Sequence, residues 1–195
     1  MEKDNTNFLN KLVKKALDKL NKEVLSIEKR EDISIDEKVS KIIILFSATC
    51  AAVATQPIPF ADIYFLTTIQ AYMGERLSAI RGIPLSQKEA KDLLVEIGGI
   101  VGLGMIAQQI ALGLYKVGLP GLAGFTTIPL VFGLTYAIGL AMDYYLEKKS
   151  KGQTVSNADL KEIFSKARKE ARKVSKDSKN IIKTISNDLE NDSIN

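Results

Sequence analysis

Hydrophobic residues recur along the chain with the spacing of amphipathic α-helices. Near the N-terminus, apolar residues three and four positions apart place one hydrophobic stripe on a helix over about residues 7–30. Near the C-terminus, spacings of four and three alternate from Leu160 to Ile185, which is a heptad seam. Two alanines and a serine lie in this seam, so we expect it to pack closely against another helix. No segment alternates strictly between apolar and polar residues with hairpin turn signals, so the pattern predicts no sheet.

Start and stop signals divide the chain into five to six helices. Three serines are followed three positions later by an acidic residue, the arrangement that begins many helices. Pro57 and Pro59 end the second helix, because proline lacks an N–H and disfavours helix in the residue before it. Gly82 ends the third. The predicted helices cover about residues 7–30, 35 to the prolines, 62–81, 87–115, 122–149 and 157–187, and the serine pairs are Ser34 with Glu37, Ser86 with Glu89, and Ser156 with Asp159.

The charged residues gather at the two ends of the chain. Residues 1–41 hold ten basic and nine acidic residues, residues 42–142 hold five of each, and residues 143–195 hold twelve and nine. We therefore predict an all-α protein with a Pro-bent helical hairpin and a Gly-rich apolar helix pair at its centre. Amphipathic helices from both ends cover this core. The expected parts are a charged N-terminal helix (1–33), an apolar core (34–149), a basic C-terminal helix (157–187) and a tail (188–195).

The apolar centre leaves membrane association open. Three uncharged runs, residues 42–61, 97–115 and 117–142, reach or approach the roughly 20 residues of a membrane-spanning helix. Gln108 and Gln109 lie inside one run and argue against spanning. Basic residues before and after the Gly-rich pair argue for a hairpin that turns at residues 118–120 and keeps both flanks in the cytoplasm. A soluble bundle with buried apolar helices fits the same pattern. The polar N-terminal residues are not of signal-peptide type.

Small residues are placed where helices could approach closely. Gly98 and Gly102, and then Gly133, Ala137 and Ala141, recur four positions apart, which puts small side chains on one helix face. Glycine inside a helix costs about 1 kcal/mol relative to alanine, so we expect close packing to offset that cost.

The composition excludes the commonest catalytic designs. The chain has no His and one Cys, Cys50, so the usual zinc ligand sets and the His-based catalytic pairs are absent. Asp92 and Glu96 share a helix face, but the Glu-x-x-His ligands of di-iron bundles are missing. We expect Cys50 to be buried. We predict no catalytic residue, no metal site, no cofactor and no enzyme activity.

The nine basic residues between Lys161 and Lys183 suit two environments. A basic helix can lie on an anionic membrane, where each basic residue contributes about 1 kcal/mol. It can also be the solvated face of a packed helix, where charge runs usually lie. Nucleic-acid binding has no aromatic platform or recognised motif behind it, and the net charge of +4 is mild.

The centre of the chain carries a motif with a family resemblance. The stretch Pro-Ile-Pro-Phe-Ala-Asp is followed by Leu66, by a Gln four residues later and by a Met three further on. This arrangement, with the Gly-rich helices after it, resembles the YcjF-like, GTPase-associated family of domains of unknown function over about residues 40–145. The residues that carry the motif are Pro57, Ile58, Pro59, Phe60, Ala61, Asp62, Leu66, Gln70 and Met73.

The resemblance implies a bacterial protein that accompanies an Era-like GTPase, and several family members are membrane proteins. No activity is established for the family, so it supplies no catalytic residue. This chain lacks the G-x-x-x-x-G-K-[ST] loop that holds nucleotide phosphates, which implies a GTPase partner in trans.

Asp62 is a preferred residue type for capping the next helix. A buried polar role for it, with Gln70 as partner, is the alternative, although Gln70 lies two helical turns away.

The function predicted from these observations is a non-catalytic, membrane-linked adaptor or effector of an Era-like GTPase. Its covering helices would shield the apolar core in one state and expose it on GTPase or membrane contact. A pore-forming protein that acts alone and a soluble interaction scaffold are the alternatives. The expected partners are a GTPase, membrane lipid and a second copy of the chain, with no nucleic acid. The expected location is the cytoplasm, associated with or inserted in the inner membrane from that side.

Overall fold

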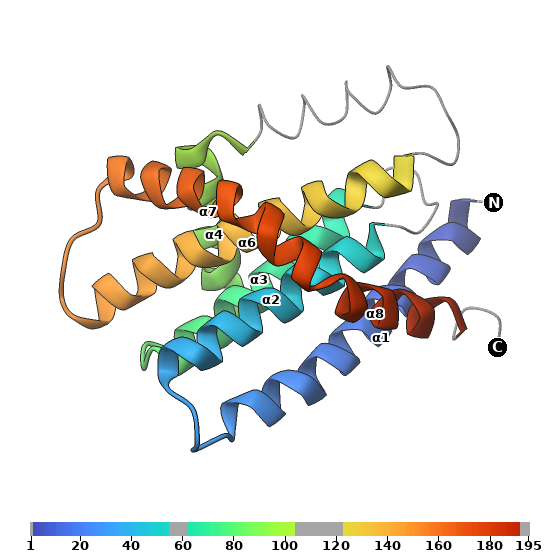
Figure 1. Ribbon diagram of the computed structural model, residues 1–195, viewed down its shortest axis with the longest axis horizontal. Coiled ribbons are helices and arrows are strands. Elements are labelled where there is room, and N and C mark those ends of the chain that lie inside the picture. The colour runs from blue at the N-terminus through green and yellow to red at the C-terminus, as the bar shows by residue number, and fades with distance from the viewer. Residues whose placement is uncertain (1, 55–61, 104–122, 192–195) are drawn as a thin grey trace.

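The protein is a bundle of packed helices in which the described residues contain no β-strand (Figure 1). The computed structural model describes the backbone of residues 2–54, 62–103 and 123–191, and the side chains of residues 14–54, 66–103 and 128–189. The all-α prediction is confirmed. The helices are α1 (Glu2–Glu28), α2 (Ile35–Val53), α3 (Asp62–Ile80), α4 (Gln87–Val101), α6 (Ala123–Ser150), α7 (Asn157–Asp177) and α8 (Lys179–Asn191).

These described ranges hold seven helices, because the C-terminal segment expected as one helix is divided at Ser178. The N–H of Ser178 still bonds the carbonyl of Val174 at 2.9 Å, but its backbone leaves helical geometry at φ −90° and ψ 4°. Both Ser175 and Ser178 are buried at this bend. The apolar spacing continues across it, which is why the sequence pattern does not reveal the break.

Helix α6 lies at the centre of the bundle and contacts α2, α3, α4 and α7. Helices α1 and α8 pack on α2 from the outside, and α8 reaches α1 (Figure 1). The largest fully buried side chains come from α1, α2, α3, α4 and α6. They are Leu20, Ile42, Ile43, Phe46, Ile69, Met73, Leu77, Ile97, Phe132, Ile138, Met142 and Leu146. Buried residues of α1, α7 and α8 belong to the same hydrophobic cluster, so the charged helices are part of the core.

All three helix starts expected from serine pairs are confirmed. In α2 the N–H of Glu37 donates to Ser34 Oγ at 3.2 Å, and the N–H of Ser34 donates to the Glu37 carboxylate at 2.9 Å. The starts of α4 and α7 have the same reciprocal bonds. These bonds satisfy N–H groups that the first helical turn leaves without partners.

Gly102 caps the C-terminal end of α4, whereas the sequence predicted that it lies inside a longer helix. Its φ is +74°, in the left-handed region, and its N–H bonds carbonyls of the last turn. The sequence pattern predicted one helix from 87 to 115, with Gly98 and Gly102 on its packing face. The structure stops the helix at Val101 because glycine adopts this conformation without steric cost. Residues 104–115 of the expected helix lie outside the described residues.

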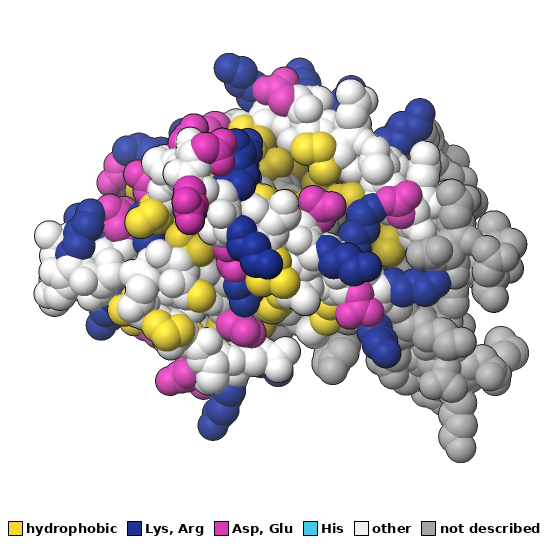
Figure 2. Space-filling model, turned by 90° about the horizontal axis from the view of Figure 1, so that it is seen from below, with side chains coloured by type: hydrophobic (Ala, Val, Ile, Leu, Met, Phe, Trp, Pro, Cys, Tyr) yellow, Lys and Arg dark blue, Asp and Glu magenta, His cyan; other side chains and the backbone are white. Residues whose placement is uncertain are grey.

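Polar contacts attach the outer helices to the core. Arg76 of α3 forms an ion pair with Glu28 of α1, with Arg76 Nε 2.8 Å from Glu28 Oε1. Lys19 of α1 pairs with Asp188 of α8. The face seen from below in Figure 2 carries acidic and basic side chains interspersed, with hydrophobic side chains between them. The division of the chain into parts at residues 33, 149 and 157 stays a prediction.

Candidate functional site

Helix α7 has one face in the core and one face of charged residues. Leu160, Phe164, Ala167 and Ala171 are buried, and α6 is the helix that α7 contacts most. Because an α-helix repeats every 3.6 residues, the remaining positions point away from this seam. They include seven lysine and arginine residues, all of them exposed: Lys161, Lys166, Arg168, Lys169, Arg172, Lys173 and Lys176.

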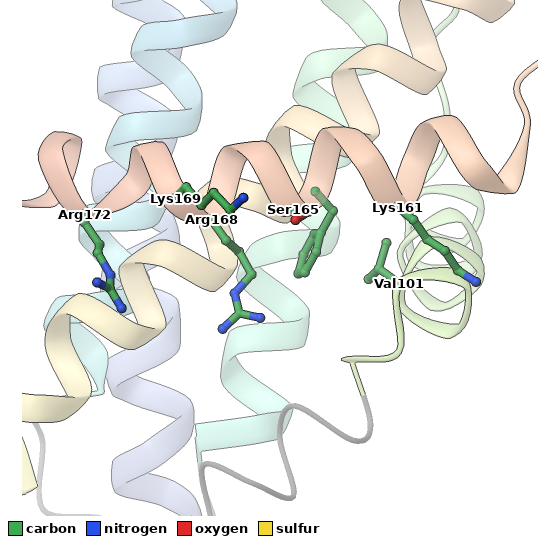
Figure 3. A pocket seen from close by; sticks show the side chains of 7 residues that line it. Val101, Lys161, Ser165, Arg168, Lys169 and Arg172 are labelled. Atoms are coloured by element: carbon green, nitrogen blue, oxygen red, sulfur yellow. The ribbon is translucent and has the colours of Figure 1, made fainter.

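Part of this charged face borders a groove between α7 and the end of α4. The groove has a volume of about 610 Å³, and four cations, Lys161, Arg168, Lys169 and Arg172, contribute to its lining. Val101 of α4, with Phe164 and Ser165 of α7, supplies the remaining described lining. Figure 3 shows Arg168 and Arg172 extending from the same side of α7, with Lys161 beside Val101. We call this feature the basic groove.

A second hollow adjoins the basic groove and has an apolar wall. Its volume is about 250 Å³, and Arg168, Ala171 and Arg172 of α7 line it on one side. The opposite wall is formed by residues of α6, namely Pro129, Leu130, Gly133 and Leu134. Arg168 and Arg172 therefore border both hollows, with cationic neighbours on one side and apolar neighbours on the other.

The cations of the basic groove have no acidic counterpart. In the part of the chain that the structure describes, none of the four forms an ion pair with a carboxylate. The acidic residues of α7 are used elsewhere: Glu162 pairs with Lys166 at 2.5 Å, and Glu170 accepts a hydrogen bond from the Tyr136 hydroxyl at 3.2 Å. Gathered positive charges repel one another, so the groove favours an anion.

Gln70, a residue of the family motif, has a defined buried contact. Its Nε2 donates to Thr135 Oγ1 at 3.0 Å, which joins α3 to α6 inside the core. Cys50 of α2 also bonds Thr135, so three helices meet at one polar junction. Cys50 is fully buried, and this burial raises the pKa of its thiol to about 12 despite the contact with Thr135. The predicted burial of Cys50 is confirmed.

Of the other motif residues named as candidate site residues, the structure describes only the side chain of Met73. Met73 is fully buried. Asp62 is the first residue of α3, and its side chain lies outside the described residues, as do Pro57, Pro59 and Phe60 entirely. The capping role of Asp62 and the bend at the prolines therefore stay predictions.

The small residues expected at helix contacts include three that lie on α6. Ala137 and Ala141 are fully buried, and a Cβ at Gly133 would lie 3.5 Å from the Ala171 Cβ, an ordinary contact with α7. Gly98 of α4 is buried, and a Cβ there would lie 3.2 Å from Leu103 Cδ1.

Two other glycines, Gly74 and Gly139, face neighbouring side chains at short range, which the spacing of small residues did not indicate. A Cβ at Gly139 would lie 2.9 Å from Ile43 Cγ2, whereas one at Gly74 would meet Met142 Cε, the far end of a flexible side chain that can turn aside. Neither belongs to a run of small residues four apart that the sequence analysis singled out.

A partly buried ion pair joins Arg81, the residue after the end of α3, to Asp143 of α6. The guanidinium of Arg81 holds Asp143 in a bidentate contact, with Nε–Oδ1 at 2.7 Å and Nη2–Oδ2 at 2.8 Å. Arg81 Nη1 also lies 2.9 Å from Asp36 Oδ1 of α2. The side chain of Arg81 is 11% exposed, and the bond to Asp143 raises the pKa of Arg81. These contacts connect Asp36 of α2, Arg81 after α3 and Asp143 of α6, so the arrangement has a structural role.

The carboxylates considered as catalytic or metal-binding residues do not form a buried cluster among the described side chains. Asp92 and Glu96 are both exposed on α4. Among the described side chains, no group of three or more His, Cys, Asp or Glu is arranged to hold a metal ion.

One described helix is long and apolar enough to cross a membrane: residues Ile128–Ser150 of α6. Of the most apolar 18-residue stretch of this helix, 56% is buried inside the protein. A central helix of a soluble bundle has the same length and composition, so α6 alone does not decide between the two environments.

The fold and the site define a class of protein: an all-α bundle with a central apolar helix, covered by charged amphipathic helices. The chain belongs to the family described as a domain of unknown function, DUF697, whose model matches residues 13–173. This agrees with the YcjF-like resemblance of the central motif.

A curated relative is magnetosome membrane protein 22 of Magnetospirillum gryphiswaldense, to which the chain is 34% identical over 96 residues. The match covers 46% of this chain and 48% of the relative, so the chain spans about half the length of the curated relative it matches. No solved structure matches the chain.

Proposed function

We propose that the protein is a non-catalytic helical adaptor that docks on an anionic membrane surface through α7 and acts with a GTPase. The observation that carries this proposal is the basic groove, where Lys161, Arg168, Lys169 and Arg172 line one hollow and form no ion pair with any carboxylate among the described side chains. Anionic lipid headgroups supply the missing negative charge. The membrane link is further supported by the curated relative, which is a magnetosome membrane protein.

Docking, with α6 kept inside the bundle, fits the packing better than spanning. Helix α6 contacts four other helices, and its Asp143 is held by Arg81, which directly follows α3. Moving α6 into lipid would separate this pair and leave an unpartnered charge in an apolar medium, which is costly. The proposed location is therefore the cytoplasmic surface of the inner membrane.

The GTPase part of the proposal rests on the resemblance to the YcjF-like family. The 195 residues contain no phosphate-binding G-x-x-x-x-G-K-[ST] loop, so the proposal assigns nucleotide hydrolysis to a GTPase domain outside these residues. The absence of His from the sequence supports a role without catalysis. Retention of an Era-like GTPase by the immobilised chain in one nucleotide state, GTP analogue or GDP, tests this part. Equal or absent retention in both states would contradict it.

Vesicle flotation with a trapped dye tests membrane docking. The purified full chain is mixed with vesicles of phosphatidylcholine, with or without phosphatidylglycerol. We expect the chain to float only with the anionic vesicles, to dissociate at high salt, and to leave the dye inside. Release of the dye would support the pore-forming alternative. A monodisperse protein that ignores both kinds of vesicle would support a soluble scaffold.

A further inference from the structure

We infer that the basic groove is a binding site for one anionic phospholipid, whose phosphate lies between Arg168 and Arg172. This inference rests on the proposed membrane function and deepens it by naming the site and its ligand. Both arginines lie on α7 four residues apart, which places them on neighbouring turns of the same face. Figure 3 shows both side chains extending in the same direction.

The cationic part of the site matches a phosphate group. Arginine presents several N–H donors in a planar fork and binds phosphate oxygens with two bonds at once. Lys161 and Lys169 add further positive charge around the same hollow of about 610 Å³. The hydroxyl of Ser165, also in the lining, is an additional donor for a headgroup oxygen.

The neighbouring hollow favours a lipid over a free anion. Its wall on α6 is formed by Pro129, Leu130, Gly133 and Leu134, which offer apolar surface and no charge. Arg168 and Arg172 stand at the boundary between this wall and the basic groove. A phosphate or nucleotide in solution would use the cations alone. A phospholipid uses both parts, because its phosphate is joined to a glycerol and an acyl chain.

Two double variants with equal charge change separate the site from general attraction. Arg168→Gln with Arg172→Gln removes the two groove arginines. Lys173→Gln with Lys176→Gln removes two exposed cations of the same helix that are not among the described lining residues. If each groove arginine contributes at least the roughly 1 kcal/mol of a surface cation, the first variant binds anionic vesicles about thirtyfold more weakly or worse. We expect the second variant to lose less than the first.

Flotation is measured with vesicles of phosphatidylcholine containing phosphatidylglycerol, and circular dichroism confirms that both variants are folded. A stronger loss for the arginine variant supports the inference. If the wild-type chain floats and both variants lose affinity equally, the groove assignment is overturned while membrane docking stands. If the wild-type chain does not float, the inference fails. Fractionation of native membranes then tests separately whether the protein associates with a membrane, as the proposed function requires.

Soluble competitors distinguish the source of the phosphate. Inorganic phosphate and glycerol phosphate at millimolar concentration are added to the wild-type chain bound to anionic vesicles, at constant ionic strength. We expect neither to displace it. Displacement by inorganic phosphate would overturn the lipid assignment in favour of a free anion, and tight binding of duplex DNA abolished in the arginine variant would assign the groove to nucleic acid.

Discussion

Single residues decide how closely the helices of this bundle approach one another. Gly139 of α6 faces Ile43 of α2 and Met73 of α3 at distances that leave no room for a methyl group. Regular spacing of small residues predicted other contacts on α6, because spacing reveals which residues share a face. It does not reveal which neighbouring helix that face meets, or how closely.

Replacing Gly139 by alanine tests the close approach. The new Cβ would lie 2.9 Å and 3.0 Å from two carbon atoms of Ile43, so α2 or α6 must shift. We expect a loss of about 1–3 kcal/mol in the free energy of unfolding, measured by urea denaturation. The control is Gly99→Ala on α4, where a Cβ meets nothing within 4 Å. That change should raise stability by up to about 1 kcal/mol. Equal effects of the two variants would contradict the packing.

The single cysteine reports directly on the integrity of the core. Cys50 is fully buried, and burial raises the pKa of its thiol to about 12. The reactive thiolate is therefore scarce at pH 8, and reagents cannot reach it. We expect no reaction with Ellman's reagent in the native protein and full reaction of one thiol in denaturant. Rapid reaction without denaturant would show that α2 and α6 separate readily.

At the scale of helices, the sequence predicts starts better than ends. The serine pairs at Ser34, Ser86 and Ser156 begin α2, α4 and α7 because cap and partner are three residues apart and act locally. Helix α4 ends with Gly102 as its cap, and the C-terminal segment breaks at Ser178. The sequence marks neither position, because glycines recur through the region around Gly102 and the apolar spacing continues across Ser178.

The ion pair between Arg81 and Asp143 connects elements that are distant in sequence, and its removal tests that connection. Asp143→Ala leaves a partly buried guanidinium with only the exposed Asp36 as partner. Breaking a fully buried pair costs about 3–5 kcal/mol, so we expect this partly buried pair to cost up to about 3 kcal/mol. Glu162→Ala, which removes the exposed pair with Lys166 on α7, is the matched control and should cost less than about 1 kcal/mol. Urea midpoints that shift equally in both variants would contradict the structural role of Arg81.

At the scale of the whole molecule, the sequence predicts an apolar centre with charged helices around it but not how the helices pack. Hydropathy is the same for a core helix and a spanning helix, and the sequence does not show that α6 contacts α2, α3, α4 and α7. The basic helix was visible in the sequence as a run of lysines and arginines. The groove was not, because Val101, which lines it, comes from α4, a helix far from α7 in the chain.

Fractionation of natively expressed protein tests the central claim most directly. Membranes from gently lysed cells are collected and washed first with high salt and then with alkaline carbonate. A docked bundle should sediment with the membranes and be released by these washes, because charge contacts are screened by salt and peripheral proteins leave at high pH. A chain found only in the soluble fraction would contradict membrane association. A chain that stays in the carbonate-washed membranes, without aggregating, would contradict docking and place α6 in the lipid.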